Sequence, residues 1–235
     1  MTAMTPLELR TQPRVVPFGD RAFLAVLGDG VDPELNRRVH GLAARIRRAR
    51  LADHGWSEPV PGYATVLAPF DPERLDPDRA QADLAAWLAD ALTSDPPPDP
   101  AMLLVEIPVR YGGEDGPDMQ AVAERLGLTP TQVADAHASV TYRVYLLGFV
   151  PGFAYLGPLP AELAIPRRSE PRPRVPAGSV AIAGRQTAVY PFATPGGWHL
   201  IGRTTAPLWD LRQDPPAILK AGERVRFVPE RGTQG

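Results

Sequence analysis

Short runs of apolar and β-branched residues in the first part of the chain are separated by turn residues, a pattern typical of strands. Two such runs, residues 14–18 and 22–27, flank the turn Gly19-Asp20 and predict an opening β-hairpin. A third strand is predicted at residues 64–70, after a segment with a different periodicity. The first part of the chain therefore contributes a sheet.

Two segments around these strands have the spacing of amphipathic helices. Asp32-Pro33 and Asp76-Pro77 each place a capping residue before a proline at the first helical position. Apolar residues then recur at helical spacing: Leu35, Val39, Leu42 and Ile46 in the first segment, and Ala80, Leu84, Trp87, Leu88 and Ala91 in the second. Strands that share helices in this way favour an α+β sandwich, with the helices on one face of a mainly antiparallel sheet.

The run Asp95-Pro96-Pro97-Pro98-Asp99-Pro100 divides the chain. Each proline lacks an N–H donor and restricts the residue before it, so no helix continues through this segment. We place the domain boundary here, with an N-terminal α+β domain in residues 1–95 and a second domain in residues 101–235. Because few contacts should cross a linker of this kind, we expect the second domain to fold by itself.

Beyond the boundary the pattern becomes richer in strands. A strand at residues 102–111 precedes short helices expected at about 117–126 and 130–138, the latter capped by Thr129. Short β-rich runs separated by glycine and proline follow at residues 142–149, 179–182, 186–190, 199–202 and 224–228. Such spacing is typical of a β-barrel or sandwich rather than of parallel β-α-β units.

Composition and charge exclude several classes of function. The absence of cysteine excludes disulfides, thiolate metal sites and a cysteine nucleophile, and the single lysine, Lys220, leaves almost no candidate for a Walker-type phosphate loop. The net charge of -2 gives no general attraction to nucleic acid or to a membrane surface. No stretch approaches the roughly 18 apolar residues of a transmembrane helix, so we expect a cytoplasmic protein.

The histidines show no recognisable metal-binding pattern. His40, His54, His137 and His199 lack the spacing of a zinc motif, and no metal site is expected. His137 lies near the predicted end of a helix, where an imidazolium would interact favourably with the helix dipole or would serve in catalysis. Both interpretations remain open from the residues alone.

A proline-stiffened segment, residues 166–176, carries the arginines Arg167, Arg168, Arg172 and Arg174. Guanidinium forks match carboxylates and phosphates, and a stiff loop loses little entropy when a ligand orders it. We therefore predict an anion site, the alternative being surface ion pairs with Glu170 or nearby acidic residues. Just upstream, residues 148–157 place aromatic side chains among glycines and prolines, which suits either core packing or a pocket wall.

Glycine-rich turns further along the chain can present backbone N–H groups to an oxyanion or a phosphate. Ser179, Gln186, Arg203 and Thr204 lie in or beside these turns and can orient a polar ligand. No nucleophile elbow and no pair of carboxylates suited to general acid–base work stands out. The residues alone thus predict a β-rich domain with an arginine-lined, glycine-rich anion pocket.

A set of short motifs runs through the second domain in a fixed order: Ile107-Pro108-Val109-Arg110-Tyr111-Gly112-Gly113, His137, Tyr142, residues 148–156, Pro166-Arg167-Arg168, Pro171-Arg172, residues 175–180, Tyr190-Pro191 and Pro195-Gly196-Gly197-Trp198. Phe18-Gly19-Asp20-Arg21 and Gly62-Tyr63 belong to the same set. In order and spacing these motifs closely resemble the KipI-like, or allophanate hydrolase subunit 1-like, family. That family includes the B-type subunits of bacterial ATP-dependent 5-oxoprolinases, and the resemblance covers nearly the whole chain.

This resemblance implies an N-terminal α+β domain followed by a cyclophilin-like β-barrel, a fold that does not by itself imply prolyl isomerase activity. It implies that the chain acts with a KipA-like C-type subunit and a LamB/YcsF-like A-type subunit, and is inactive alone. The complex would use Mg²⁺-bound ATP, shared with the partner subunit, to activate 5-oxoproline for hydrolysis to L-glutamate. No biotin is expected on this chain.

The motifs and the resemblance together give a set of candidate site residues. His137 and Arg172 are the catalytic candidates, and the candidates for binding substrate or nucleotide are Arg167, Ser179, Gln186, Tyr190, Gly196, Gly197, Trp198 and Arg203. Two other functions stay open: inhibition of a sensor histidine kinase by binding alone, and a carboxyltransferase or allophanate hydrolase component acting on a urea-like substrate. Neither nucleic acid nor a membrane is expected as a partner.

Overall fold

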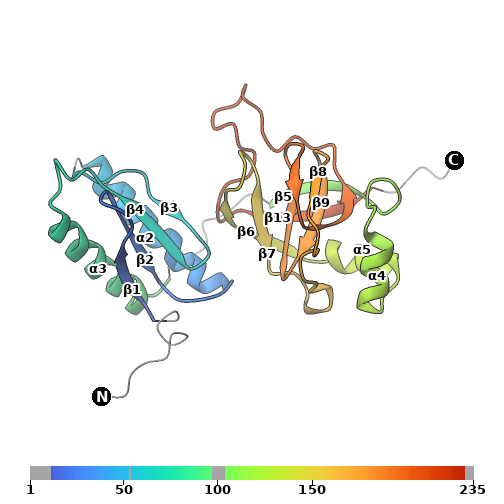
Figure 1. The fold of residues 1–235 in the computed structure, drawn as a ribbon, viewed down its shortest axis with the longest axis horizontal. Coiled ribbons are helices and arrows are strands. Elements are labelled where there is room, and N and C mark those ends of the chain that lie inside the picture. Colours follow the sequence, from blue (N-terminus) through green and yellow to red (C-terminus); the bar gives the residue numbers. More distant parts are fainter. Residues whose placement is uncertain (1–11, 53, 97–103, 231–235) are drawn as a thin grey trace, which may run out of the picture. The chain divides into compact units, whose positions relative to one another are not determined.

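The computed structural model describes residues 12–52, 54–96 and 104–230. The chain divides into two compact units, Met1–Pro100 and Ala101–Gly235, drawn in blue to teal and in green to red in Figure 1. The proline run that we predicted as the domain boundary falls at the end of the first unit. Its residues 97–100, like the predicted start of the next strand at residues 102 and 103, lie outside the described residues.

Over its described residues, the first unit is an antiparallel sheet with two helices. Its strands are ordered β1 (Arg14–Pro17), β2 (Ala22–Val26), β4 (Thr65–Pro69) and β3 (Val60–Pro61), and its helices are α2 (Pro33–Leu51) and α3 (Pro77–Thr93). Strands β1, β2 and β4 and both helices lie where the sequence predicts them, within a residue or two. The two-residue strand β3 was not predicted, because it is too short to show an alternating pattern.

Both helices begin at the predicted aspartates. The carboxylate of Asp32 accepts a hydrogen bond from Leu35 N at 2.7 Å, and that of Asp76 accepts one from Arg79 N at 3.0 Å. Each cap satisfies a backbone donor that the first helical turn leaves without an intrahelical partner. The predicted caps are therefore confirmed.

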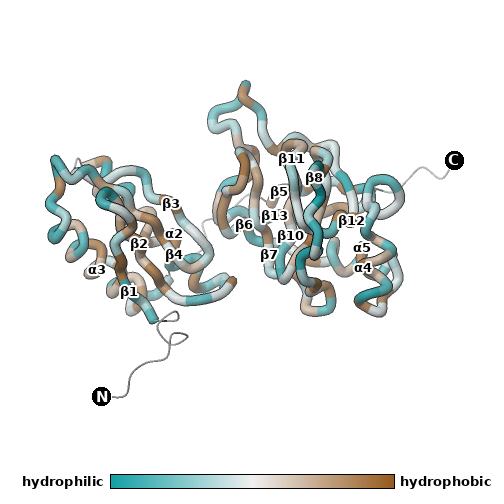
Figure 2. Tube along the Cα trace, in the orientation of Figure 1, coloured by the Kyte–Doolittle hydropathy of each residue, from teal (hydrophilic) through white to brown (hydrophobic). Residues whose placement is uncertain are grey.

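The core of the first unit lies between the sheet and its helices. In β2 and β4 the buried positions alternate with half-exposed ones such as Leu24 and Leu67, so one face of the sheet is covered. The buried cluster includes Phe23, Ala25, Val66 and Ala68 from the strands and Leu42, Ile46, Leu84 and Leu88 from the helices. Hydrophobic colour follows these strands in Figure 2. The predicted α+β sandwich is confirmed.

The second unit is built on a closed barrel. Its strands follow the order β10 (Gln186–Val189), β7 (Ala154–Gly157), β6 (Thr141–Leu147), β13 (Arg224–Pro229), β5 (Leu104–Tyr111), β12 (His199–Arg203) and β9 (Ser179–Ala183), and β9 pairs with β10 to close it. The barrel confirms the predicted fold class. One pair departs from the antiparallel arrangement, because the last strand, β13, runs parallel to the first, β5.

Short elements surround this barrel. They are α4 (Met119–Leu126), α5 (Pro130–Ala138), the 3-10 helix η1 (Ala161–Leu163), and a ribbon of β8 (Arg172–Val175) with β11 (Thr194–Gly196). Thr129 and Gln132 form a reciprocal capping box at the start of α5. The arginine segment, predicted as a loop, contributes the strand β8, which Figure 2 shows as hydrophilic.

Strand β9 separates two apolar clusters because its side chains alternate between them. Val180 and Ile182 belong to the main core of the barrel, which also contains residues of α4 and α5. Ala181 and Ala183 belong to a second cluster that includes Val175 of the β8–β11 ribbon together with Phe153, Tyr190 and Trp198. The ribbon therefore covers the second face of this part of the barrel wall, and the candidate residues gather there.

Candidate functional site

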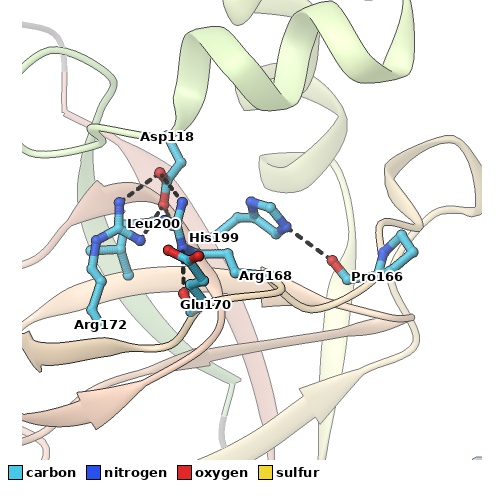
Figure 3. Close-up of polar contacts among 7 residues, drawn as sticks. All are labelled: Asp118, Pro166, Arg168, Glu170, Arg172, His199 and Leu200. Carbon is cyan, nitrogen blue, oxygen red and sulfur yellow. Dashed lines mark hydrogen bonds and ion pairs between the residues drawn. The ribbon is translucent and has the colours of Figure 1, made fainter.

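A buried carboxylate, Asp118, binds two of the arginines in the predicted anion segment. Arg172 donates from Nη1 to Oδ2 at 2.9 Å and from Nη2 to Oδ1 at 2.7 Å, and Arg168 donates from Nη1 to Oδ1 at 3.1 Å. The backbone N–H of Leu200 donates to Oδ2 at 2.7 Å. Figure 3 shows both guanidinium groups converging on Asp118, whose side chain is 7% exposed. We call these residues the Asp118 clamp.

The anion that Arg172 holds in the structure is thus a carboxylate of the same chain. The two parallel N–H···O contacts are the arrangement that an arginine fork makes with a carboxylate. Sequence reasoning missed Asp118, which stands 54 residues before Arg172 and directly before α4, where an aspartate is an ordinary helix cap. Its side chain makes no capping hydrogen bond, because the clamp uses both oxygens.

Further contacts fix the arginine segment on the barrel. His199 Nε2 donates to the carbonyl of Pro166 at 2.9 Å, as Figure 3 shows, and the backbone N–H of Arg168 donates to the carbonyl of Gly197 at 2.9 Å. The guanidinium carbon of Arg167 lies 5.9 Å from the ring centre of Trp198, within the range of a cation–π contact. The segment is therefore held at several points.

Aromatic rings form the wall beside this segment. Phe153 contacts Tyr155, Tyr190 and Trp198 with centroid separations of 4.9, 5.3 and 6.0 Å. Phe153, Tyr190 and Trp198 are buried, so core packing describes these rings, whereas Phe149 is 59% exposed. Burial raises the pKa of Tyr190, with Tyr155 adding to the effect, which keeps its phenol protonated as a hydrogen-bond donor.

Gly196 permits the close approach of the ribbon to Tyr190. A Cβ atom at this position would lie 2.4 Å from the Tyr190 hydroxyl oxygen, a distance that side-chain atoms cannot adopt without displacement. The candidates Gly196, Gly197 and Trp198 are therefore brought together with Tyr190 and Arg167 around the β8–β11 ribbon. Of these, Gly197 contributes its backbone carbonyl and Trp198 its ring.

A cleft of about 540 Å³ opens next to Tyr190. Its walls include Arg110, Gly178, Tyr190, Arg203, Thr204 and Trp209. Gly178 has a φ of +80°, and a Cβ there would lie 2.2 Å from the carbonyl oxygen of Thr204, so the wall requires glycine at this point. The predicted residues Arg203 and Tyr190 thus line a cleft together with Arg110, which belongs to the recognised motif but was not singled out.

The cleft arginines are anchored through their Nε atoms. Arg110 Nε donates to Asp115 Oδ2 at 2.7 Å, a hydrogen bond that raises the pKa of Arg110, and Arg203 Nε donates to the carbonyl of Ala177 at 3.2 Å. The nearest ion-pair partner of the Arg203 terminal nitrogens is Asp115 Oδ1 at 3.9 Å from Nη1. In the part of the chain that the structure describes, these terminal nitrogens make no hydrogen bond, so they can bind a ligand.

Two polar candidates lie elsewhere along the β9–β10 hairpin. Ser179 is buried at the start of β9, and its backbone carbonyl accepts from Tyr190 N at 3.0 Å. Gln186 pairs with Ala183 at the opposite end of the hairpin. The structure therefore brings Ser179 close to the cleft wall but does not bring Gln186 to it.

His137 lies in the main core and not at the cleft. Its Nδ1 is 2.6 Å from the Tyr111 hydroxyl and its Nε2 is 2.8 Å from the Thr187 hydroxyl. Since Thr187 donates its own proton to the carbonyl of Ala181 at 3.1 Å, Nε2 carries the proton and Nδ1 accepts from Tyr111. Burial lowers the pKa of His137 to about 3. Complete burial disfavours the charged form of His137, which argues against the imidazolium interpretation.

This burial makes His137 a source of pH-dependent stability. The folded pKa of about 3 lies below the ordinary value of 6.5, so between these values the unfolded chain binds one more proton. Stability that is present above pH 6.5 should be lost toward pH 3, by up to about 1.4 kcal/mol per pH unit. The free energy of unfolding, measured with urea, should fall as the pH is lowered from 7 to 5. His137→Gln should reduce the slope of this dependence by the equivalent of about one proton. Equal slopes for both proteins would contradict this assignment.

Neither a metal site nor a membrane span is found in the described parts of the chain. Across residues 12–52, 54–96 and 104–230, no group of three or more histidine, aspartate or glutamate side chains is arranged to hold a metal ion. No helix in these ranges is both long and apolar enough to cross a membrane.

Comparison with known proteins places this chain in a known class. Residues 13–219 match the family described as carboxyltransferase domain, subdomain C and D, and the chain belongs to that family. Its curated relatives include the B-type subunit of 5-oxoprolinase from Bacillus subtilis (strain 168), 37% identical over 92% of both chains. The corresponding 5-oxoprolinase subunit of Escherichia coli O157:H7, also of the B type, is 47% identical over 91% of this chain and 94% of that relative. These relatives confirm the family that the motifs indicated.

A solved structure shows the same fold. TTHA0988 is 40% identical, with a TM-score of 0.77 over 92% of this chain. The present chain spans 41% of the length of that polypeptide. In TTHA0988 the matching region is therefore joined to further polypeptide.

Proposed function

We propose that the chain is the B-type subunit of an ATP-dependent 5-oxoprolinase. The observation that carries this proposal is the similarity to two relatives of that name, which extends over more than nine-tenths of each relative's length. Similarity of this extent includes both structural units, so it is not limited to one of them. The chain would act with a KipA-like C-type subunit and a LamB/YcsF-like A-type subunit.

The proposed reaction opens the lactam ring of 5-oxoproline to give L-glutamate. ATP, bound with Mg²⁺ and shared with the C-type subunit, would supply a phosphoryl group to the amide oxygen, releasing ADP. The ring carbon then becomes electrophilic, water adds to it, the C–N bond breaks, and a second water releases phosphate. Charge develops on oxygen atoms during these steps, and fixed hydrogen-bond donors stabilise such charge.

The arginine cleft supplies donors of this kind. Arg110 and Arg203 present terminal guanidinium nitrogens whose Nε atoms are already held by Asp115 and Ala177. The forks are therefore oriented before a carboxylate or phosphate arrives, which reduces the entropy lost on binding. A cleft of about 540 Å³ is in the size range of small-molecule sites. The residues present thus fit an anionic substrate.

Two features support a requirement for partner subunits. The cleft is only partly enclosed by this chain, and in TTHA0988 the matching region occupies 41% of a longer polypeptide. Closing an active site excludes water and strengthens the electrostatic interactions inside it. A second subunit over the cleft would provide that closure.

We therefore expect no 5-oxoproline turnover by the purified chain and ATP-dependent glutamate formation when the A- and C-type subunits are added. The measurement is glutamate and ADP release, with each subunit omitted in turn as the control. Activity of the lone chain would refute the requirement for partners. An inactive mixture of all subunits, each verified as folded and assembled, would refute the 5-oxoprolinase function.

The family description favours one other candidate, a carboxyl-transfer component, for which the sequence analysis left a urea-like substrate open. The same mixtures assayed with urea, bicarbonate and ATP in place of 5-oxoproline distinguish the two reactions. ADP release that depends on urea and not on 5-oxoproline would support the carboxyltransferase function instead.

A further inference from the structure

The backbone at Phe149 is strained, and its side chain is 59% exposed. Phe149 is the one non-glycine residue with a positive φ, 72°, among residues 12–52, 54–96 and 104–230. Val150 N donates to the carbonyl of Gly148 at 2.9 Å, which closes a three-residue γ-turn around Phe149. Turns of this kind with positive φ are rare and strained. Strain that persists in a folded protein often marks a functional position.

The strained turn forms one wall of an apolar hollow of about 410 Å³. The hollow is lined by residues 147–152 together with Trp209 and Ala217. Gly152 lies directly against Trp209, since a Cβ atom on Gly152 would be 3.1 Å from the Cβ of Trp209. The exposed ring of Phe149 and the half-buried side chain of Trp209 both line this hollow.

The apolar hollow adjoins the arginine cleft. Trp209 lines both of them. In addition, the ring of Phe149 from the hollow lies perpendicular to that of Tyr190 from the cleft, with centroids 6.4 Å apart. One surface thus joins an aromatic part to a part with two guanidinium forks.

We propose that this chain itself binds the nucleotide, with the purine base in the apolar hollow and the phosphates at Arg110 and Arg203. The inference rests on the proposed function, which requires ATP, and assigns the nucleotide to particular residues of this subunit. A purine offers a flat face for stacking on Phe149 and Trp209. Phosphate oxygens match the arginine forks. 5-Oxoproline has no aromatic ring and would leave the hollow unfilled.

The charges next to the cleft explain why the phosphates would arrive with a cation. Asp115 lies beside both arginines, and Glu230 Oε2 is 3.8 Å from Arg110 Nη1. These carboxylates offset much of the arginine charge. Mg²⁺ on the phosphates reduces the remaining repulsion, because it neutralises part of the charge of the triphosphate.

Direct binding tests the proposal without any activity assay. Isothermal titration calorimetry of the full chain, and of its complex with the C-type subunit, would use three probes: Mg²⁺–ATP, Mg²⁺–triphosphate and adenosine. We expect Mg²⁺–ATP to bind most tightly. Phe149→Gly, Trp209→Leu and Arg203→Gln should each raise its Kd by about tenfold or more. Phe149→Gly also relieves the positive φ, and thermal melting checks that each variant remains folded.

The matched control is Arg185→Gln, an exposed arginine at the β9–β10 turn, which should leave the Kd unchanged. Phe149→Gly and Trp209→Leu remove the contacts to the base, so only these two substitutions should make Mg²⁺–ATP and Mg²⁺–triphosphate bind equally. The proposal is overturned if neither the chain nor its complex binds Mg²⁺–ATP, or if all three variants bind it like the parent protein. Failure of glutamate formation with intact Mg²⁺–ATP binding would refute the 5-oxoprolinase function and leave the nucleotide site standing.

Discussion

Asp118→Ala is expected to lower the free energy of unfolding of the second unit by about 3 to 5 kcal/mol, the usual cost of removing one partner from a buried ion pair. The substitution leaves the guanidinium groups of Arg168 and Arg172 without their carboxylate and the N–H of Leu200 without its acceptor. Amide hydrogen exchange measured by peptide gives the stability of each unit in one experiment. Strands β9 and β12 should lose protection, whereas β2 and β4 should not.

The control for this change is Asp135→Ala. Asp135 is exposed on α5, and its replacement should change stability by no more than about 0.5 kcal/mol. If Asp118→Ala were as stable as Asp135→Ala, the clamp would have no net stabilising role, and its ion pairs would resemble ordinary surface pairs.

Arg172→Lys should lower the stability of the second unit by about 1.5 to 3 kcal/mol, the range for hydrogen bonds to charged groups. A lysine can approach only one oxygen of Asp118 at a time, whereas the arginine fork binds both. In the Asp118→Ala background the same substitution should have little further effect, because the partner is already absent. A double-mutant cycle from urea unfolding measures this coupling.

Arg174→Lys, two residues further along β8 and exposed, is the matched control and should leave stability unchanged. The outcome also separates two roles of Arg172. Coupled losses of stability and glutamate formation identify a positioning residue that acts through the clamp. Full stability with lost activity, and no coupling to Asp118, would instead mean that Arg172 binds an external anion, as the sequence predicted.

Local signals predicted most of the elements correctly. Asp32, Asp76 and Thr129 each cap a helix where the sequence places one, because capping depends on residues within a single turn. Strands with a regular apolar pattern were also found within one or two residues. The boundary of α4 was less accurate: it begins at Met119 rather than near residue 117.

Pairing between distant segments was not predictable in the same way. The β8–β11 ribbon joins Val175 to Thr194, and its strands are too short and too rich in proline and arginine to show β periodicity. The parallel pairing of β5 with β13 depends on closing the whole barrel, which no local pattern encodes. The overall spacing of the strands predicted the fold class, but it did not predict which strands pair or in which register.

The candidate site was predicted only in part, because its contacts also join segments that are distant in the sequence. The candidates Arg167, Tyr190 and Trp198 were chosen from the motifs. They lie on one surface, where the ribbon packs on the barrel. The anion expected for Arg172 proved to be Asp118, which no nearby signal marks as its partner. His137 lies within the motifs and Gln186 within a glycine-rich turn, but the first folds into the core and the second lies at the far end of a hairpin. A motif shows which residues belong to a family, and only the packing shows what each one contacts.

The parallel pair of β5 and β13 determines the order in which the two units can mature on the ribosome. Arg226 of β13 pairs with Glu106 of β5 across a separation of 120 residues, so the barrel cannot close until nearly the whole chain has been synthesised. The described strands and helices of the first unit precede residue 97 and can assemble earlier. Until β13 emerges, β5 and β6 have open edges, which are sites of aggregation in nascent proteins. The last described strand thus controls whether newly made protein can complete its barrel.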